Sequence, residues 1–289
     1  MMKKLSLNLL ALCLVFYACA QKDSSVRLVV RGDDMGYSHS GNLAIIQCYQ
    51  EGIQQSIEVI VPSPWFPEAV RLLEENPGVD VGIHLALTSE WDNVKWRPLT
   101  ECPGITDPDG YFYPMIRPHK KYPGQSILEN DWKIEEIEQE FRAQIELALK
   151  KIPRITHITG HMGCTGFDNK VKVLAEQLAK EYNLYIDLDR LGVSRATYAG
   201  PKGTSEEKIE SFIKMLRELK PGTYIMVDHP GLNNAELQAI SHIGYETVAI
   251  DRQGVTDTWT SEKVKAAIKE LGIEIISYAD LKRKSDALK

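Results

Sequence analysis

Acidic and imidazole side chains stand at several points where a short β-branched run gives way to turn residues. Asp33 and Asp34 follow one such run, His84 lies near the end of a second, and His157 and His161 lie near the end of a third. The carboxyl ends of parallel strands converge at one face of an α/β barrel, so these side chains are expected to meet there. One carboxylate and two imidazoles, with open positions for water and substrate, form the ligand set of a hydrolytic metal centre. A turn aspartate or a strand histidine alone is more typical of a helix cap or a packed core, so it is the joint placement that favours a metal site.

A fourth group follows at the end of a later run, in the stretch Met-Val-Asp-His-Pro-Gly over residues 226–231. Pro-Gly forces the chain to turn directly after His229. His229 is therefore a candidate proton donor at the same end of the barrel. The alternative is that Asp228 or His229 only caps the next helix.

The elements that would position these groups alternate along the chain in the βα order of a mainly parallel sheet or barrel. Strands are predicted at 27–31, 57–61, 79–87, 154–158, 184–188, 223–227 and 273–277. Helices are predicted at 39–51, 65–75, 132–151, 168–182, 205–219 and 261–271. Residues 234–259 stay open, because 245–250 suits either an extra strand or part of a helix. Residues 21–289 are thus predicted to form one α/β domain, a barrel of about seven mainly parallel strands.

Residues 88–131 interrupt this alternation with an aromatic loop insertion that shows no helical or strand period. The segment holds six of the fourteen prolines and the aromatic residues Trp91, Trp96, Tyr111, Phe112, Tyr113 and Tyr122. A loop of this length inside a compact domain is usually functional or disordered, and its aromatic content favours an ordered lid over the end of the barrel. There the rings would either stack on sugar rings or only cap the barrel.

The first 20 residues have the order of a bacterial export signal, with two lysines, an apolar run and then Ala-Cys-Ala. The apolar run is too short for a transmembrane helix, which needs roughly 20 residues. A cysteine after a small residue resembles a lipobox, so Cys19 is predicted to be lipidated after cleavage; ordinary cleavage after this triplet is the alternative. We therefore expect an exported protein, lipid-anchored in the cell envelope in the periplasm or on the outer surface, with no other attachment to the membrane.

Composition excludes several classes of protein. A chain of 289 residues that is 43% hydrophobic and 26% charged is ordinary globular material. A net charge of −6 without any block of Lys or Arg argues against a nucleic acid partner, whose phosphates require a basic face. Beyond the leader, Cys48, Cys102 and Cys164 are odd in number and form no CxxC pair, so neither a disulfide framework nor a cysteine zinc site is indicated. A homodimer is an open alternative to a monomer.

At these motifs the sequence resembles the YdjC-like carbohydrate deacetylases, the ChbG and HpnK group. The matching blocks, in order, are Asp-Asp-x-Gly at 33–36, Gly-Ile-His-Leu-x-Leu-Thr at 82–88, Thr-His-Ile-x-x-His at 156–161 and His-Pro-Gly at 229–231. The terminal Ile-Ile-Ser-Tyr-Ala-Asp-Leu also fits. The resemblance implies a deformed (β/α) barrel that uses one divalent metal to remove N-acetyl groups from amino sugars or oligosaccharides, releasing acetate.

Carried over residue by residue, the resemblance makes Asp34, His84 and His161 the metal ligands and Asp33 the general base. It makes His229 the matching acid or oxyanion-stabilising group. Magnesium or zinc is the expected ion, with cobalt or nickel as alternatives. An acetylated amino sugar or oligosaccharide is the expected substrate, and the sequence does not indicate which residues bind it.

The third block departs from the family. The family usually has an aspartate two residues after the first histidine and another histidine two residues after the second, where this chain has Thr159 and Gly163. The three ligands are kept, but the groups that would orient them differ. Two other interpretations stay open: two histidines and one carboxylate also hold iron(II) in non-haem oxygenases, and a degenerate site would leave an exported glycan-binding lipoprotein.

Overall fold

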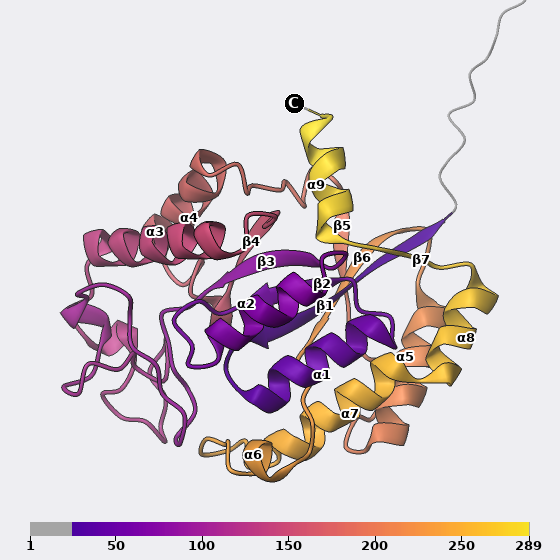
Figure 1. Cartoon of the computed structure of the whole chain (residues 1–289), viewed down its shortest axis with the longest axis horizontal. Coiled ribbons are helices and arrows are strands. Elements are labelled where there is room, and N and C mark those ends of the chain that lie inside the picture. The colour runs from indigo at the N-terminus through magenta and orange to yellow at the C-terminus, as the bar shows by residue number, and fades with distance from the viewer. Residues whose placement is uncertain (1–24, 289) are drawn as a thin grey trace, which may run out of the picture.

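A single parallel sheet forms the centre of the protein, described for residues 25–288 by a computed structural model (Figure 1). Its strands are β1 (Val26–Met35), β2 (Ser56–Val59), β3 (Asp80–Leu85), β4 (His157–Gly160), β5 (Val193–Ala196), β6 (Gly222–Asp228) and β7 (Glu274–Ile276). They follow the order β4-β3-β2-β1-β6-β5, and β7 pairs with the first half of β1. Within residues 25–288 no strand joins β4 to β5, so the sheet curls into a half-barrel. The predicted α/β fold of about seven parallel strands is confirmed.

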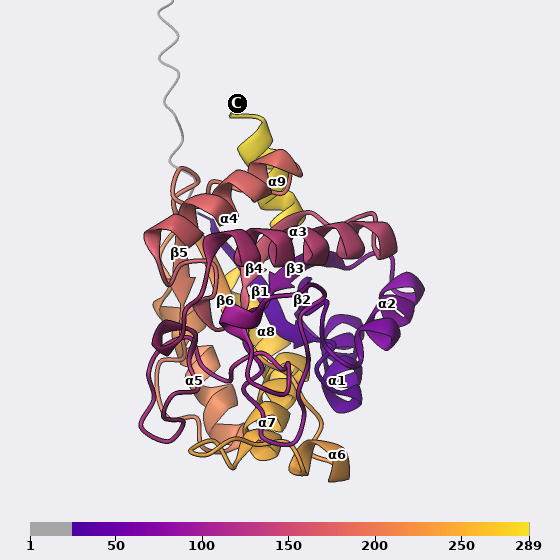
Figure 2. The same ribbon diagram turned by 90° about the vertical axis from the view of Figure 1, so that its left-hand side faces the viewer.

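Helices cover the outside of the sheet (Figures 1 and 2). Their bounds are α1 (His39–Gln50), α2 (Phe66–Glu75), α3 (Ile134–Lys151), α4 (Asn169–Glu181), α5 (Ser205–Glu218), α6 (Ala235–Gln238), α7 (Val248–Thr260), α8 (Glu262–Leu271) and α9 (Tyr278–Asp286). Buried residues on α4 follow the 3.6-residue period of one helix face, at Val171, Leu174, Ala175 and Leu178. The neighbouring helices α3 and α4 pack together, and so do α5, α7 and α8. These contacts close the apolar core on the outer side of the strands.

The long strand β1 lies at the centre of the sheet and positions the first residues of the candidate site. Leu28, Val29 and Val30 are completely buried, as expected for a parallel strand covered on both faces. β6 pairs with β1 from Val26 to Gly32, while β2 pairs with its second half. β1 therefore carries the residues that follow Gly32 out to the carboxyl end of the half-barrel.

One prediction of secondary structure needs correction, and the structure assigns the segment that the sequence left open. Residues 184–188 alternate apolar and polar residues like a strand, but they form a loop, and the fifth strand is β5, nine residues later. The loop buries Leu184 and packs Ile186 and Leu188 beside a small apolar cluster, which explains the misleading pattern. In the open region 234–259, α7 begins at Val248, so most of that segment is helical.

The segment between β3 and α3 forms an ordered cover over the carboxyl ends of the strands (Figure 2). It contains only the short 3-10 turns η1 (Pro103–Ile105) and η2 (Ile127–Glu129), together with isolated bridges such as Thr106 to Phe112. Trp91, Trp96 and Phe112 are almost fully buried. These rings therefore pack into the core, as in the capping alternative, and are not exposed for stacking on a sugar.

The predicted export signal at residues 1–20, including Cys19, lies outside the described residues. Within residues 25–288, no helix has both the length and the apolar composition needed to cross a membrane.

Candidate metal centre

Asp33 and Asp34 lie at the carboxyl end of β1, where the strand loses its regular register with β2. The pairing shifts between Gly32 and Met35, and Asp34 adopts a left-handed backbone with φ 70°. In a regular strand, neighbouring side chains point to opposite faces. The irregularity instead brings both carboxylates to the same histidine, with Asp33 Oδ2 at 3.7 Å and Asp34 Oδ1 at 3.5 Å from His84 Nε2. Asparagine and aspartate tolerate this backbone better than other non-glycine residues.

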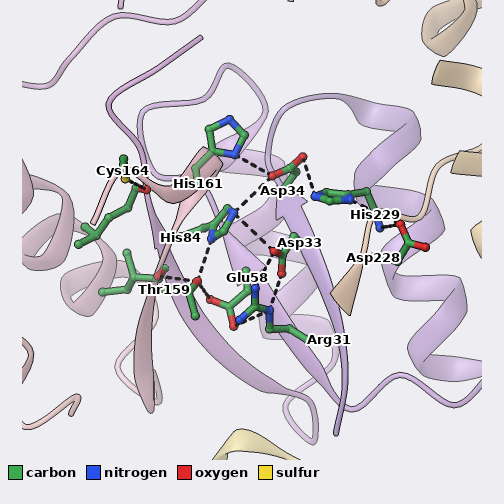
Figure 3. Close-up of polar contacts among 12 residues, drawn as sticks. Arg31, Asp33, Asp34, Glu58, His84, Thr159, His161, Cys164, Asp228 and His229 are labelled. Atoms are coloured by element: carbon green, nitrogen blue, oxygen red, sulfur yellow. Dashed lines mark hydrogen bonds and ion pairs between the residues drawn. The ribbon is translucent and has the colours of Figure 1, made fainter. Parts of the chain in front are cut away.

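Asp34, His84 and His161 converge from β1, from β3 and from the turn after β4 (Figure 3). One ligand atom of each lies within 4.8 Å of the others, and all three residues are buried. Asp34 Oδ1 is 3.1 Å from His161 Nδ1 and 3.5 Å from His84 Nε2. Ligand atoms around one zinc ion, at bond lengths of about 2.0–2.2 Å, lie roughly 3–3.6 Å apart. The donor set and its spacing therefore fit a single divalent ion.

His84 offers one ring nitrogen to this centre and is held by the other. Its Nδ1 lies 2.8 Å from the hydroxyl of Thr159, which leaves Nε2 facing Asp34. Burial and the neighbouring His161 lower the pKa of His84 to about 3, so the imidazole is neutral at physiological pH. A neutral imidazole is the form that binds a metal.

His161 is held between two carboxylates. Its Nδ1 faces Asp34, and its Nε2 lies 2.8 Å from Oε2 of Glu90, which belongs to the cover segment. Burial lowers the pKa of His161, but Glu90 and Asp34 raise it more strongly, to about 10. With the Nε2 proton directed at Glu90, the Nδ1 atom is the one available to a metal.

The second oxygen of Asp34 is held by cationic groups. Arg252 of α7 donates to Asp34 Oδ2 at 3.0 Å, and His229 Nε2 lies 3.7 Å from the same oxygen. Arg252 is almost fully buried, with its guanidinium over the rings of Tyr37 and Trp91. Burial alone would raise the pKa of Asp34, but His229, His161 and Arg252 hold it well below its ordinary value. Asp34 is therefore an ionised carboxylate that keeps its Oδ1 turned toward His84 and His161.

Asp33 is fixed by Arg31, two residues earlier on the same face of β1. The guanidinium donates to both carboxylate oxygens, at 2.7 and 2.8 Å, and also to the hydroxyl of Tyr278 at 2.8 Å. This two-point pair sets the plane of the Asp33 carboxylate and leaves its edge toward His84. Asp33 is 4% exposed, and its Oδ2 lies 3.7 Å from His84 Nε2. It is therefore a buried carboxylate beside the candidate centre.

His229 follows β6 and completes the group at the carboxyl end of the half-barrel. Its side chain is 39% exposed, and its Nδ1 lies 3.6 Å from Asp228 Oδ1. Burial lowers the pKa of His229, but Asp34 and Asp228 raise it above its ordinary value. Its position beside Asp34 and open to solvent suits a group that exchanges protons.

The structure thus brings together Asp33, Asp34, His84, His161 and His229, and it leaves His157 out. His157 lies on β4 with Nε2 against Glu58 and its ring stacked on Tyr278, 4.0 Å between centroids. Of the two departures from the family pattern, Thr159 contacts His84, whereas Gly163 has φ 76° with open space beyond its Cα. A side chain at position 163 would be strained by that backbone conformation.

Four residues of the site were missed by sequence reasoning: Arg31, Glu58, Glu90 and Arg252. Two of them carry a local signal. Arg31 lies two residues before Asp33, which is the spacing that puts two side chains on one face of a strand. Glu58 is a lone acid inside a completely buried strand, where a charge is rare unless it is paired. Glu90 and Arg252 carry no such signal, because only the folded chain brings the cover segment and α7 to the centre.

Known proteins are similar to this chain in sequence and in fold. Residues 27–270 match the YdjC-like protein family. The chain belongs to this family. A relative, the carbohydrate deacetylase of Clostridium beijerinckii, is 31% identical over 267 residues, which cover 89% of this chain and all of that protein. The carbohydrate deacetylase of Enterococcus faecalis is 27% identical over 275 residues, which cover 89% of this chain and 99% of that protein.

One solved structure has the same fold. A protein of Enterococcus faecalis V583, described as a suspected cellobiose-phosphate cleavage protein, matches with a TM-score of 0.68 at 23% identity. The match covers 89% of this YdjC-like chain and 99% of the other. At this identity the likeness establishes the fold, and it agrees with the half-barrel described above.

Proposed function

We propose that this YdjC-like protein is a metal-dependent hydrolase that removes N-acetyl groups from amino sugars or their oligosaccharides and releases acetate. The observation that carries the proposal is the buried cluster of Asp34, His84 and His161, with Asp33 and His229 at its edge. Its relatives named carbohydrate deacetylase support the substrate class. The acetamide is the bond proposed to be cleaved.

Asp34, His84 and His161 would hold one divalent ion. Two imidazole nitrogens and one carboxylate oxygen suit zinc, cobalt or nickel better than magnesium, which prefers an all-oxygen shell. When bound, such an ion polarises a carbonyl and lowers the pKa of a coordinated water toward 7. We therefore propose zinc as the first ion to test, with cobalt, nickel and magnesium beside it.

The protein's own residues supply the proton transfers. Asp33, fixed by Arg31, takes a proton from the attacking water as general base. His229 donates a proton to the departing amine nitrogen, since an amide nitrogen leaves poorly as an anion. Its contacts with Asp34 and Asp228 favour the protonated form that this step needs. The products are acetate and a free amino sugar.

The test is acetate release by the full chain, stripped of metal and then refilled with zinc, cobalt, nickel or magnesium. The substrate panel contains N-acetylated mono- and oligosaccharides. Acetate that appears only with metal supports the proposal and begins to name the sugar. Stoichiometric metal without acetate from any member would contradict N-deacetylation, and oxygen consumption with iron(II) would favour the oxygenase interpretation. Chelation-insensitive glycan binding without product would favour the binding-protein interpretation.

We further propose that the protein is exported and anchored by a lipid on Cys19. The support is the leader, in which two lysines, an apolar run and Ala-Cys-Ala follow in order. Metabolic labelling with a fatty acid should mark the wild-type chain in the membrane fraction, and Cys19→Ser should lose the label. A wild-type chain that takes no label and fractionates with soluble proteins would contradict the anchor.

A further inference from the structure

The nitrogen of His84 that faces away from the candidate metal is held by an unusual partner. Its Nδ1 lies 2.8 Å from the hydroxyl oxygen of Thr159, a neutral group. A hydroxyl is neutral and can either donate to or accept from a ring nitrogen. Thr159 alone therefore does not determine which nitrogen of His84 carries the proton.

Glu58 removes that ambiguity. Its Oε2 accepts a hydrogen bond from the Thr159 hydroxyl (Figure 3). Its Oε1 contacts His157 Nε2. An ionised carboxylate only accepts hydrogen bonds, so the single hydroxyl proton of Thr159 is directed at Glu58. The hydroxyl oxygen must then accept from Nδ1–H of His84. This leaves the Nε2 lone pair of His84 facing Asp34, as a metal ligand requires.

Groups other than Thr159 stabilise the ionised form of the Glu58 carboxylate. Glu58 is completely buried, with His157 against one oxygen and the Arg31 guanidinium 4.0 Å away. The other ring nitrogen of His157 is 2.7 Å from the Thr156 hydroxyl, which itself donates to Asp80. The Glu58 carboxylate thus belongs to a hydrogen-bond network that includes His157, Thr156 and Asp80. A buried carboxylate stays ionised when its neighbours bond to it in this way.

Strand register explains how Glu58 reaches β4 across β3. Glu58 pairs with Gly82, and Gly82 pairs with His157, so the glycine lies between the two side chains. A Cβ at Gly82 would come within 2.5 Å of both Glu58 Oε2 and His157 Nε2. Two residues further on, His84 pairs with Thr159. The missing side chain at position 82 is what allows the carboxylate to meet Thr159.

We propose that Glu58 and Thr159 are positioning residues that together fix the tautomer and orientation of His84. The inference rests on the proposed metal site, but the tautomer of His84 is a property of the metal-free protein and is measured separately.

The first experiment reads the imidazole directly. Nitrogen-15 NMR of the metal-free full chain distinguishes the two neutral tautomers of histidine, and His84→Gln assigns the resonance. Wild type should show His84 protonated at Nδ1, and Thr159→Val should shift it toward the other tautomer or a mixture. Thr159→Ser, which keeps the hydroxyl, should resemble wild type. The same tautomer in wild type and Thr159→Val would overturn the proposal, whether or not the protein binds metal.

The second experiment measures zinc affinity by competition with a chromophoric chelator. Thr159→Val should weaken binding by about 10–100-fold, the range typical for loss of a group that orients a ligand. Thr159→Ser should stay near wild type, and so should Thr260→Val, a matched removal of a half-buried hydroxyl that bonds only to a helix carbonyl. Unchanged affinity in Thr159→Val, with a lowered melting temperature, would reduce Thr159 to a structural role and overturn the inference.

A charge swap tests the pair as a unit. Glu58→Gln offers one acceptor instead of two, so it satisfies His157 or Thr159 but not both, and zinc affinity should fall. In the Thr159→Val background the same change should have little further effect, because the link to His84 is already broken. Thr159→Asp alone would place two carboxylates together and weaken binding, whereas Glu58→Gln with Thr159→Asp should recover it. If Glu58→Gln and Thr159→Val had additive effects on zinc affinity, Glu58 would not act on His84 through Thr159, and the proposal would be contradicted.

Discussion

Asp33 and Asp34 are neighbours in the chain, yet both carboxylates lie within 3.7 Å of one atom, Nε2 of His84. The left-handed backbone of Asp34 and the shifted register of β1 produce this arrangement. The two carboxylates differ in their other hydrogen bonds. Arg31 donates to both oxygens of Asp33, whereas Arg252 donates to one oxygen of Asp34. The two acids can therefore take different roles, one as a base and one as a ligand.

Asp33→Asn should separate catalysis from metal binding. The amide keeps one oxygen for Arg31 but cannot take a proton, so turnover should fall by about 10²–10⁴-fold, the usual contribution of a general base. Zinc affinity should stay near wild type, because Asp34 remains. Asp109→Asn, at an exposed turn of the cover segment, is the matched control and should leave both quantities unchanged. Preserved acetate release in Asp33→Asn would remove Asp33 from the base role.

His84→Ala should remove one of the three proposed metal ligands. The remaining Asp34 and His161 hold an ion less tightly, so zinc occupancy at stoichiometric metal should drop along with acetate release. His39→Ala is the matched control, since His39 is 42% exposed, pairs with Glu68 and does not belong to the cluster of Asp34, His84 and His161. Metal content is measured by atomic absorption after gel filtration. A His84→Ala protein with wild-type zinc content would take His84 out of the ligand set.

The pH profile of kcat/KM should carry the signature of His229. Asp34 and Asp228 raise the pKa of the partly buried His229 above its ordinary value. The imidazolium therefore persists to higher pH than in a free histidine and is lost as pH rises through the raised pKa, so activity should decline on the alkaline side. His229→Gln should lower kcat by about 10²–10⁴-fold and abolish that decline. An unchanged alkaline limb in the variant would assign it to another group.

Gly82→Ala should destabilise the fold and the site together. Its new methyl would overlap Glu58 and His157 at 2.5 Å, and such overpacking typically costs about 1–3 kcal/mol in the free energy of unfolding. Gly166→Ala provides the comparison, because a Cβ there meets nothing within 4 Å and should change stability by less than about 0.5 kcal/mol. Urea denaturation of both variants gives the two values. Equal stability of the pair would show that Glu58 and His157 move aside freely.

The strands that carry the site follow from local sequence, but the fifth strand does not. The runs before Asp33, around His84 and before His161 are β-branched and end in turns, and each forms a strand, although the last begins at His157, three residues later than predicted. Residues 184–188 show the same alternation without forming a strand. The short edge strand β5 exists because Val193–Ala196 pairs with β6, and that pairing depends on a partner distant in the chain.

The sequence by itself determined which chemical groups reach the carboxyl end of the half-barrel, because a strand followed by Asp-Asp-x-Gly or His-Pro-Gly exposes those side chains wherever the strand is placed. Tertiary structure decided which of them meet. His161 joins the centre while His157, four residues earlier, turns to Glu58. Glu90 and Arg252 enter from the cover segment and from α7. The physical reason is register: contacts between strands about 100 residues apart depend on pairing, and a shift of one residue would point each side chain to the other face.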